Sequence, residues 1–258
     1  AHDTWNWAMV VLALIVSLAL QVGVNLANDY SDGIRGTDAQ RVGPLRLVGS
    51  GLVAPHVVKR AAFLCFGVAG LAGLVIAANT TWWLVAVGVA CIAAAWFYTG
   101  GPRPYGYAGF GEVFVFVFFG LVATVGTAFA ATGMFDTWAL LPGTAVGILA
   151  TQLLIINNLR DIPTDVVSGK RTLAVRMGDV ATRRLYVALT CVFVVVVLVS
   201  SLTERWSLMA LVSLVVAWKP SRGVLLGKTG TDLVPVLGAT ARFQLVAGVL
   251  LTIGIALS

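Results

Sequence analysis

Residues 7–38 read WAMVVLALIVSLALQVGVNLANDYSDGIRGTD, an apolar run that ends in a cluster of acids. No charged side chain occurs in residues 7–28, and about 20 apolar residues are enough for an α-helix to cross a bilayer. The stretch therefore predicts a membrane-spanning helix that carries Asp29, Asp32 and Asp38 at its far end.

The composition of the whole chain extends this prediction to a polytopic membrane protein. Hydrophobic residues make up 59% of the 258 residues and charged residues only 11%, which is far outside the range of soluble domains. We expect an all-α fold, a single transmembrane domain over residues 1–258, with Lys219 and Pro220 ending the shortest span early. Eight apolar segments, bounded by Gly, Pro or charge, lie at about 7–28, 58–78, 82–99, 110–132, 137–157, 181–201, 205–219 and 236–256.

The positive charges fall almost entirely into alternate connections between these segments. Lys and Arg concentrate in cytoplasmic loops, so we expect a multi-pass protein of the cell membrane with both acidic clusters toward the cytoplasm. The net charge of +6 then reflects topology and not nucleic-acid binding. This orientation puts Ala1 outside, so we expect an earlier span to be missing and the domain to be incomplete at its N-terminus.

A second acidic cluster repeats the spacing of the first. Asn28 is followed four residues later by Asp32, and Asn157 by Asp161, with Asp165 four residues further on. On a helix such residues lie on one face, one turn apart. Uncompensated charge at a membrane boundary costs free energy, so acids there indicate a functional site. Carboxylate and amide oxygens suit Mg²⁺, whose shell substrate phosphates can complete.

Cations and tyrosines gather close to the acids. Arg41 and Arg46 follow the first cluster and Lys170 and Arg171 the second. Acids that bind Mg²⁺ beside cations that bind phosphate oxygens predict a diphosphate site, although topology alone also favours cations there. Between the clusters, the Gly- and Pro-rich segment YTGGPRPYGY over residues 98–107 offers Tyr98, Arg103 and Tyr105 as ligand contacts, or as an aromatic belt at the interface.

Polar residues also line the predicted helices that lead into the acids. Asn25 precedes the first cluster and Gln152 the second. Such a stripe must face protein or water and not lipid. Both a substrate contact and a hydrogen-bonded seam between helices remain open for these two residues.

Taken together, these segments resemble the UbiA superfamily of intramembrane prenyltransferases. The resemblance rests on NDYSD at 28–32 with Gly36 and Asp38, RVGPLR at 41–46, the 98–107 segment, GEVFVF at 111–116, NNLRDIPTD at 157–165 and GKRTL at 169–173. Within the superfamily the chain is most similar to the MenA branch, which prenylates 1,4-dihydroxy-2-naphthoate in menaquinone synthesis. Gly36, with Asp38 two residues later, is the pattern of that branch.

The resemblance implies nine transmembrane helices around a central cavity, with the first helix absent from this chain. It also implies that two Mg²⁺ ions, replaceable by Mn²⁺, neutralise a polyprenyl diphosphate while an aromatic acid attacks the prenyl cation and loses CO₂. The implied partners are these two substrates and the lipid bilayer, with no nucleic acid and no obligate protein partner. The implied metal ligands are Asn28, Asp32, Asp38, Asn157, Asp161 and Asp165; the catalytic set adds Tyr98 and Arg103 to the four aspartates; the implied substrate contacts are Asn25, Asp29, Arg41, Arg46, Tyr105, Arg160, Lys170 and Arg171.

Three alternatives remain at this point. Another ring acceptor, such as 4-hydroxybenzoate or homogentisate, is the nearest. A CDP-alcohol phosphotransferase would need an Asp-Gly followed by Ala-Arg and then two further spaced acids within one segment, and Asp32-Gly33-Ile34-Arg35 only begins that pattern. A cation-coupled transporter would use the acids as an ion site, but the cation-rich loops favour an anionic substrate.

Overall fold

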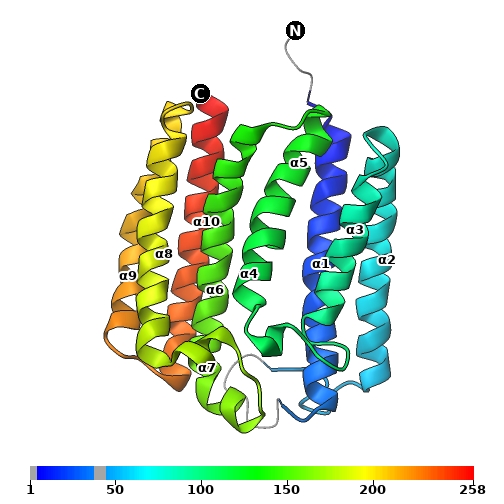
Figure 1. The fold of residues 1–258 in the computed structure, drawn as a ribbon, viewed down its shortest axis with the longest axis vertical. Coiled ribbons are helices and arrows are strands. Elements are labelled where there is room, and N and C mark those ends of the chain that lie inside the picture. The colour runs from blue at the N-terminus through cyan, green and yellow to red at the C-terminus, as the bar shows by residue number, and fades with distance from the viewer. Residues whose placement is uncertain (1–4, 38–44) are drawn as a thin grey trace. The chain divides into compact units, whose positions relative to one another are not determined.

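The computed structural model describes residues 5–37 and 45–258, and the regular structure within them is helical throughout (Figure 1). Seven helical segments of the described residues are long and apolar enough to cross a membrane, and the shorter apolar helix Leu84–Phe97 corresponds to the span predicted at 82–99. The prediction of an all-α, multi-pass membrane fold is confirmed for the described part of the chain.

The chain divides into two compact units. The first unit comprises Ala1–Ala108 and Val125–Asp136, and the second comprises Gly109–Thr124 and Thr137–Ser258. Each unit contains one of the two acidic clusters. The immediate surroundings of each cluster are therefore formed within its own unit.

The first unit is built around α1 and α2, which run in opposite directions (Figure 1). Their close approach depends on small residues, because a Cβ atom added at Gly23 would lie only 2.6 Å from the ring of Phe66. Ala27 and Ala62 are fully buried beside this contact. The helical elements of this unit are α1 (Trp7–Ile34), α2 (Pro55–Asn79), α3 (Leu84–Phe97), η1 (Gly106–Ala108) and most of α5 (Ala123–Thr132).

The second unit is organised by α6, which packs against α8, η2 and α10. Gly120 and Gly147 bring η2 and α6 into backbone contact, since a Cβ atom at Gly120 would lie 2.3 Å from the Gly147 Cα. Phe193 and Phe243 meet edge to face in the core. The elements are α4 (Gly111–Val115), η2 (Phe116–Val122), η3 (Thr137–Ala139), α6 (Leu140–Val167), α7 (Leu173–Met177), α8 (Asp179–Ser200), η4 (Arg205–Ser213), α9 (Leu214–Leu225), η5 (Gly230–Leu233) and α10 (Val234–Leu257).

Helix length carries both acidic clusters beyond the apolar layer. α1 and α6 each have 28 residues, or about 42 Å at 1.5 Å per residue, whereas the hydrocarbon core of a bilayer is about 30 Å thick. The last turns of each helix therefore project past the apolar spans predicted at 7–28 and 137–157. Asp32, Asp161 and Asp165 lie on these turns, and α6 continues through Pro163.

One predicted boundary is wrong. Lys219 and Pro220 do not end the seventh span, because α9 continues to Leu225 with Pro220 inside it. A proline removes one helical N–H, and neighbouring groups can compensate for that loss in membrane helices. Here Pro220 is buried, and Arg183 donates to the carbonyl of Val224 in the last turn of the helix, beyond the proline.

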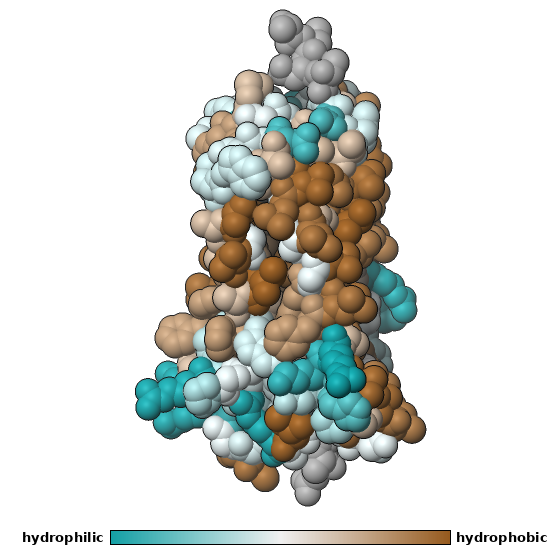
Figure 2. All heavy atoms as spheres, turned by 90° about the vertical axis from the view of Figure 1, so that its right-hand side faces the viewer, coloured by the Kyte–Doolittle hydropathy of each residue, from teal (hydrophilic) through white to brown (hydrophobic). Residues whose placement is uncertain are grey.

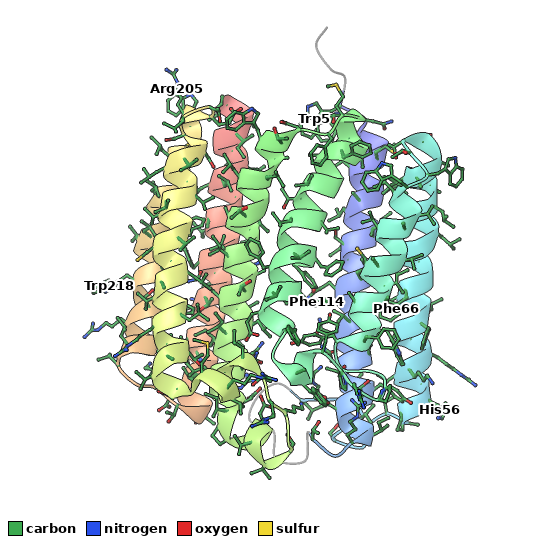
Figure 3. The ribbon with its side chains drawn as sticks, in the orientation of Figure 1. Trp5, His56, Phe66, Phe114, Arg205 and Trp218 are labelled. Atoms are coloured by element: carbon green, nitrogen blue, oxygen red, sulfur yellow. The ribbon has the colours of Figure 1, made fainter. Side chains whose placement is uncertain are left out.

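The surface of the first unit matches a helix pair in lipid. Exposed large apolar side chains cover α2, among them Phe63, Leu64 and Leu71. Figure 2 shows apolar side chains over the middle of this face and hydrophilic ones gathered toward its lower end. Trp5 and His56 mark opposite ends of the unit (Figure 3), and the end with His56 is where α1 carries its acids.

Candidate active site

The first cluster occupies one face of the last two turns of α1. Asp29 and Asp32 are buried, although they lie near the end of the helix. The Asp29 carboxylate accepts the backbone N–H groups of Leu47 at 2.8 Å and Val48 at 3.0 Å. In this structure Asp29 therefore secures the turn that follows the cluster, and its contact with substrate stays a prediction.

Asn28 and Asp32 both accept hydrogen bonds from residues 98–107, which we call the 98–107 loop. The hydroxyl of Thr99 donates to Asn28 Oδ1 at 2.8 Å, and the hydroxyl of Tyr107 donates to Asp32 Oδ1. Burial raises the pKa of the Tyr107 phenol, and the negative charge of Asp32 raises this pKa further. The phenol consequently stays protonated at neutral pH and remains a hydrogen-bond donor.

Arg35 fastens the same loop to α1. Its guanidinium donates to the backbone carbonyls of Thr99 and Gly101 and lies over the Tyr107 ring, 5.3 Å from the centroid. Sequence reasoning treated Arg35 only as a topological charge. The signal was present nonetheless, since Arg35 follows Asn28 by seven residues and Asp32 by three and so shares their face of the helix.

The predicted loop residues have different surroundings. Tyr98 and Tyr105 meet edge to face with ring centroids 5.5 Å apart, and the Tyr105 hydroxyl donates to the Ala94 carbonyl. Burial raises the pKa of the Tyr105 phenol as well. Arg103 is exposed. Gly106 is needed at the base of the loop, because a Cβ atom there would lie 2.6 Å from the Tyr98 carbonyl oxygen.

Two further predicted substrate contacts, Asn25 and Arg46, meet one turn before the cluster on α1. Asn25 is exposed and donates to the Gln21 carbonyl, while Arg46 donates to the carbonyl of Asn25 at 3.3 Å. Arg46 is therefore held beside the acid-bearing end of α1. Asp38 and Arg41 lie outside the described residues, and their predicted roles stay predictions.

The second cluster lies on the last turns of α6 in the second unit. Asn157, Asp161 and Asp165 recur at intervals of four residues and so share one face of the helix. Arg160 binds both oxygens of Asp161, with Nε and Nη2 each at 2.7 Å from a carboxylate oxygen. The side chain of Arg160 is only 1% exposed, and its Nη1 atom is buried with no hydrogen-bond partner among the described residues.

A short loop after α6 supports Asp165. The Thr172 hydroxyl donates to Asp165 Oδ2 at 3.3 Å and also accepts from the backbone N–H of Val175 at the start of α7. The backbone N–H of Lys170 donates to the Asp165 carbonyl. These bonds keep Lys170 and Arg171, the two predicted diphosphate ligands, next to the cluster.

One buried pair was missed by sequence reasoning. Asn158 Nδ2 donates to Glu112 Oε1 at 2.9 Å, and Glu112 Oε2 is buried without a partner in the described part of the chain. The helix dipole explains an acid in the first turn of a helix, so the sequence offered no reason to single out Glu112. Gln152 is a seam residue, since its Nε2 donates to the Tyr186 carbonyl and to Thr190 of α8.

The donor sets suit a hard cation. Within residues 5–37 and 45–258, no three His, Cys, Asp or Glu side chains form a metal group. Mg²⁺, however, takes few protein ligands and keeps waters and phosphate oxygens in its shell. Asn28 with Asp32, and Asn157 with Asp161 and Asp165, fit that requirement in their respective units, and the unpartnered Arg160 Nη1 is a donor for an anionic oxygen.

Comparisons with known sequences agree with these features. The sequence profile of the UbiA prenyltransferase family matches residues 1–232. A 1,4-dihydroxy-2-naphthoate octaprenyltransferase from Mycobacterium tuberculosis is 50% identical over 93% of this chain and 82% of its own length. The Escherichia coli protein of the same name is 36% identical over 96% of this chain and 84% of its own length.

Solved structures show the same fold. The apo structure of a UbiA homologue from Aeropyrum pernix K1 matches with a TM-score of 0.77 at 14% identity, covering 97% of this chain and 91% of that one. A UbiA homologue from Archaeoglobus fulgidus bound to DMAPP and Mg²⁺ matches with a TM-score of 0.61 at 15% identity, covering 96% of this chain and 89% of that one.

Proposed function

The chain belongs to the UbiA prenyltransferase family, and we propose that it transfers a polyprenyl group from a polyprenyl diphosphate to 1,4-dihydroxy-2-naphthoate in menaquinone synthesis. The observation that carries this proposal is the 50% identity, over 93% of the chain, to a relative named for that acceptor. The nearest alternative acceptors, 4-hydroxybenzoate and homogentisate, become outcomes of the test below.

The chain's own residues have three tasks in this reaction. Asn28 with Asp32 in the first unit, and Asn157 with Asp161 and Asp165 in the second, would each hold Mg²⁺. Bound Mg²⁺, or Mn²⁺ in its place, supplies charge neutralisation for the diphosphate of the donor. Arg160 would donate from its buried Nη1 to a phosphate oxygen, and Arg46, Lys170 and Arg171 would supply further charge-assisted contacts to a diphosphate.

The bond changes are those of a decarboxylative alkylation. The bond between the allylic carbon and the diphosphate oxygen breaks. The ring carbon of the naphthoate that bears the carboxylate then attacks the allylic carbon. The electron pair of the ring–carboxylate bond then restores aromaticity as CO₂ leaves. The apolar helices protect the allylic cation from water, and no covalent intermediate with the enzyme is needed.

We further propose that the protein resides in the cell membrane with both acidic clusters facing the cytoplasm. In each unit, the end that carries the acids also carries most of the basic residues, including Lys59 and Arg60 in the first unit and Arg183 and Arg184 in the second. This distribution is the one that the positive-inside rule associates with cytoplasmic loops.

The test is a diphosphate-release assay on the purified protein with a polyprenyl diphosphate and a panel of aromatic acceptors. We expect dihydroxynaphthoate to react far faster than 4-hydroxybenzoate, with carboxyl-labelled carbon leaving as CO₂ in step with diphosphate. A prenylated product that retains the label, or a preference for hydroxybenzoate, would overturn the assigned acceptor. Cation-driven uptake into vesicles without diphosphate release would favour a transporter.

A further inference from the structure

Two hydroxyl groups of the 98–107 loop bind the two predicted metal ligands of α1. Thr99 donates to Asn28 and Tyr107 donates to Asp32, and each bond engages one oxygen of its partner. An amide oxygen has two acceptor positions and a carboxylate about four, so these bonds fix the side chains while using only part of their acceptor capacity.

The loop has its own supports, so these bonds join two ordered segments. The Gly106 N–H donates to the Tyr98 carbonyl at 2.9 Å, and the Tyr105 hydroxyl donates to the Ala94 carbonyl at 2.7 Å. Arg35 then fastens the loop to α1 through the carbonyls of Thr99 and Gly101 and the ring of Tyr107. The hydroxyls of Thr99 and Tyr107 are thereby held in place by contacts within the protein itself.

We infer that Thr99 and Tyr107 are positioning residues of the first metal site. They act through Asn28 and Asp32, whose side chains they hold with oxygens directed at the cation, while Arg35 holds the loop that presents the two hydroxyls. The inference rests on the proposed function for the identity of the cation.

A neutral donor suits this task better than a charged one. A phenol or alcohol orients a carboxylate or amide without cancelling the negative charge that attracts Mg²⁺. Arg35 lies only three residues after Asp32, yet its guanidinium donates to the carbonyls of Thr99 and Gly101 and, at 3.5 Å, to the Tyr107 hydroxyl. Partners that orient metal ligands typically contribute about 10- to 100-fold to metal affinity.

The test compares single-hydroxyl deletions with a matched control. Tyr107→Phe keeps the ring over Arg35 and removes only the hydroxyl, and Thr99→Val removes the other hydroxyl at nearly constant shape. The control is Tyr30→Phe, because Tyr30 is on α1 two residues from Asp32 but stacks on Trp96 with a centroid distance of 6.2 Å. Mn²⁺ binding is measured by electron paramagnetic resonance on the purified full chain, in the presence of inorganic diphosphate.

We expect Tyr107→Phe and Thr99→Val each to weaken Mn²⁺ binding by about 10- to 100-fold, and Tyr30→Phe to leave it unchanged. Raising the metal concentration should restore turnover of these two variants, because their metal ligands are intact and only the affinity for the metal is reduced. In an Asp32→Ala background, Tyr107→Phe should have little further effect, because the oxygen that accepts from the Tyr107 hydroxyl is absent.

Wild-type Mn²⁺ affinity in both Tyr107→Phe and Thr99→Val would overturn the inference. Full additivity of Tyr107→Phe with Asp32→Ala, or a wild-type protein that binds no Mn²⁺, would overturn it as well. Failure of the proposed function is a separate result. A protein that binds Mn²⁺ with the predicted dependence on Thr99 and Tyr107, yet does not prenylate dihydroxynaphthoate, would refute the acceptor and retain the positioning role.

Discussion

Arg160 donates two hydrogen bonds of 2.7 Å to the two carboxylate oxygens of Asp161, its immediate neighbour on α6. Consecutive helical residues normally point in different directions, so this fork requires both side chains to turn toward each other. The arginine side chain is 1% exposed and the aspartate side chain 17%. A predicted diphosphate ligand and a predicted metal ligand thus form a largely buried ion pair in this structure.

This pair predicts an uneven response to single and double substitutions. Asp161→Asn removes the countercharge of a buried guanidinium, and breaking such a pair from one side costs about 3–5 kcal/mol. Replacing both residues, as in Arg160→Met with Asp161→Leu, should recover part of the lost stability while abolishing turnover. Thermal unfolding of the purified protein measures both effects, and a melting temperature unchanged by Asp161→Asn would contradict the buried ion pair.

Turnover should depend on a divalent cation and on the carboxylates of both clusters. Asp32→Ala, Asp161→Ala and Asp165→Ala should each lower the rate by orders of magnitude, because the donor diphosphate is then poorly neutralised. Asp136→Ala is the matched control, since Asp136 is an exposed acid in the connection before η3. Full diphosphate release in excess EDTA would refute the metal requirement.

The basic residues beside the clusters should determine affinity for the prenyl donor. A charge-assisted hydrogen bond contributes about 1.5–3 kcal/mol, so Arg46→Gln, Lys170→Gln and Arg171→Gln should each raise the KM for the donor about tenfold or more. Arg205→Gln, at the opposite end of the second unit (Figure 3), serves as the control. If the three variants and the control share the same donor KM, these cations serve topology alone.

The Glu112–Asn158 pair predicts a stability effect at a site that the sequence did not reveal. Asn158→Leu removes the hydrogen bond to Glu112 Oε1. A buried carboxyl then loses its side-chain donor, which costs about 1–3 kcal/mol of stability. Adding Glu112→Leu removes the stranded group and should restore part of the stability. Unfolding curves of the single and double variants decide the matter, and equal destabilisation by both would argue against the pair.

Glycine contacts in the second unit give a steric prediction. Gly120→Ala would place a Cβ atom 2.3 Å from the Gly147 Cα, so η2 and α6 must separate and the melting temperature should fall. Gly126→Ala is the control, because a Cβ atom there meets nothing within 4 Å and alanine favours a helix. Similar melting temperatures for the two variants would show that the backbones do not touch.

Sequence reasoning captured the parts of the site that depend on local pattern. Asn157, Asp161 and Asp165 were predicted to share a helix face, and α6 places them on one. It failed at Pro220, where proline was taken to end a span although packing and a bond from Arg183 to the Val224 carbonyl accompany a helix that continues. It also overlooked Glu112 and Arg35, whose importance depends on partners far away in the chain.

The sequence alone determined where the membrane helices lie and which acids end them, because apolar runs and four-residue spacings act within a single helix. Only the tertiary structure decided which groups meet those acids. Thr99 is 71 residues from Asn28, Tyr107 is 75 residues from Asp32, and Glu112 is 46 residues from Asn158. Such contacts form when separate helices pack and a loop folds over their ends, and periodicity within one segment does not encode them.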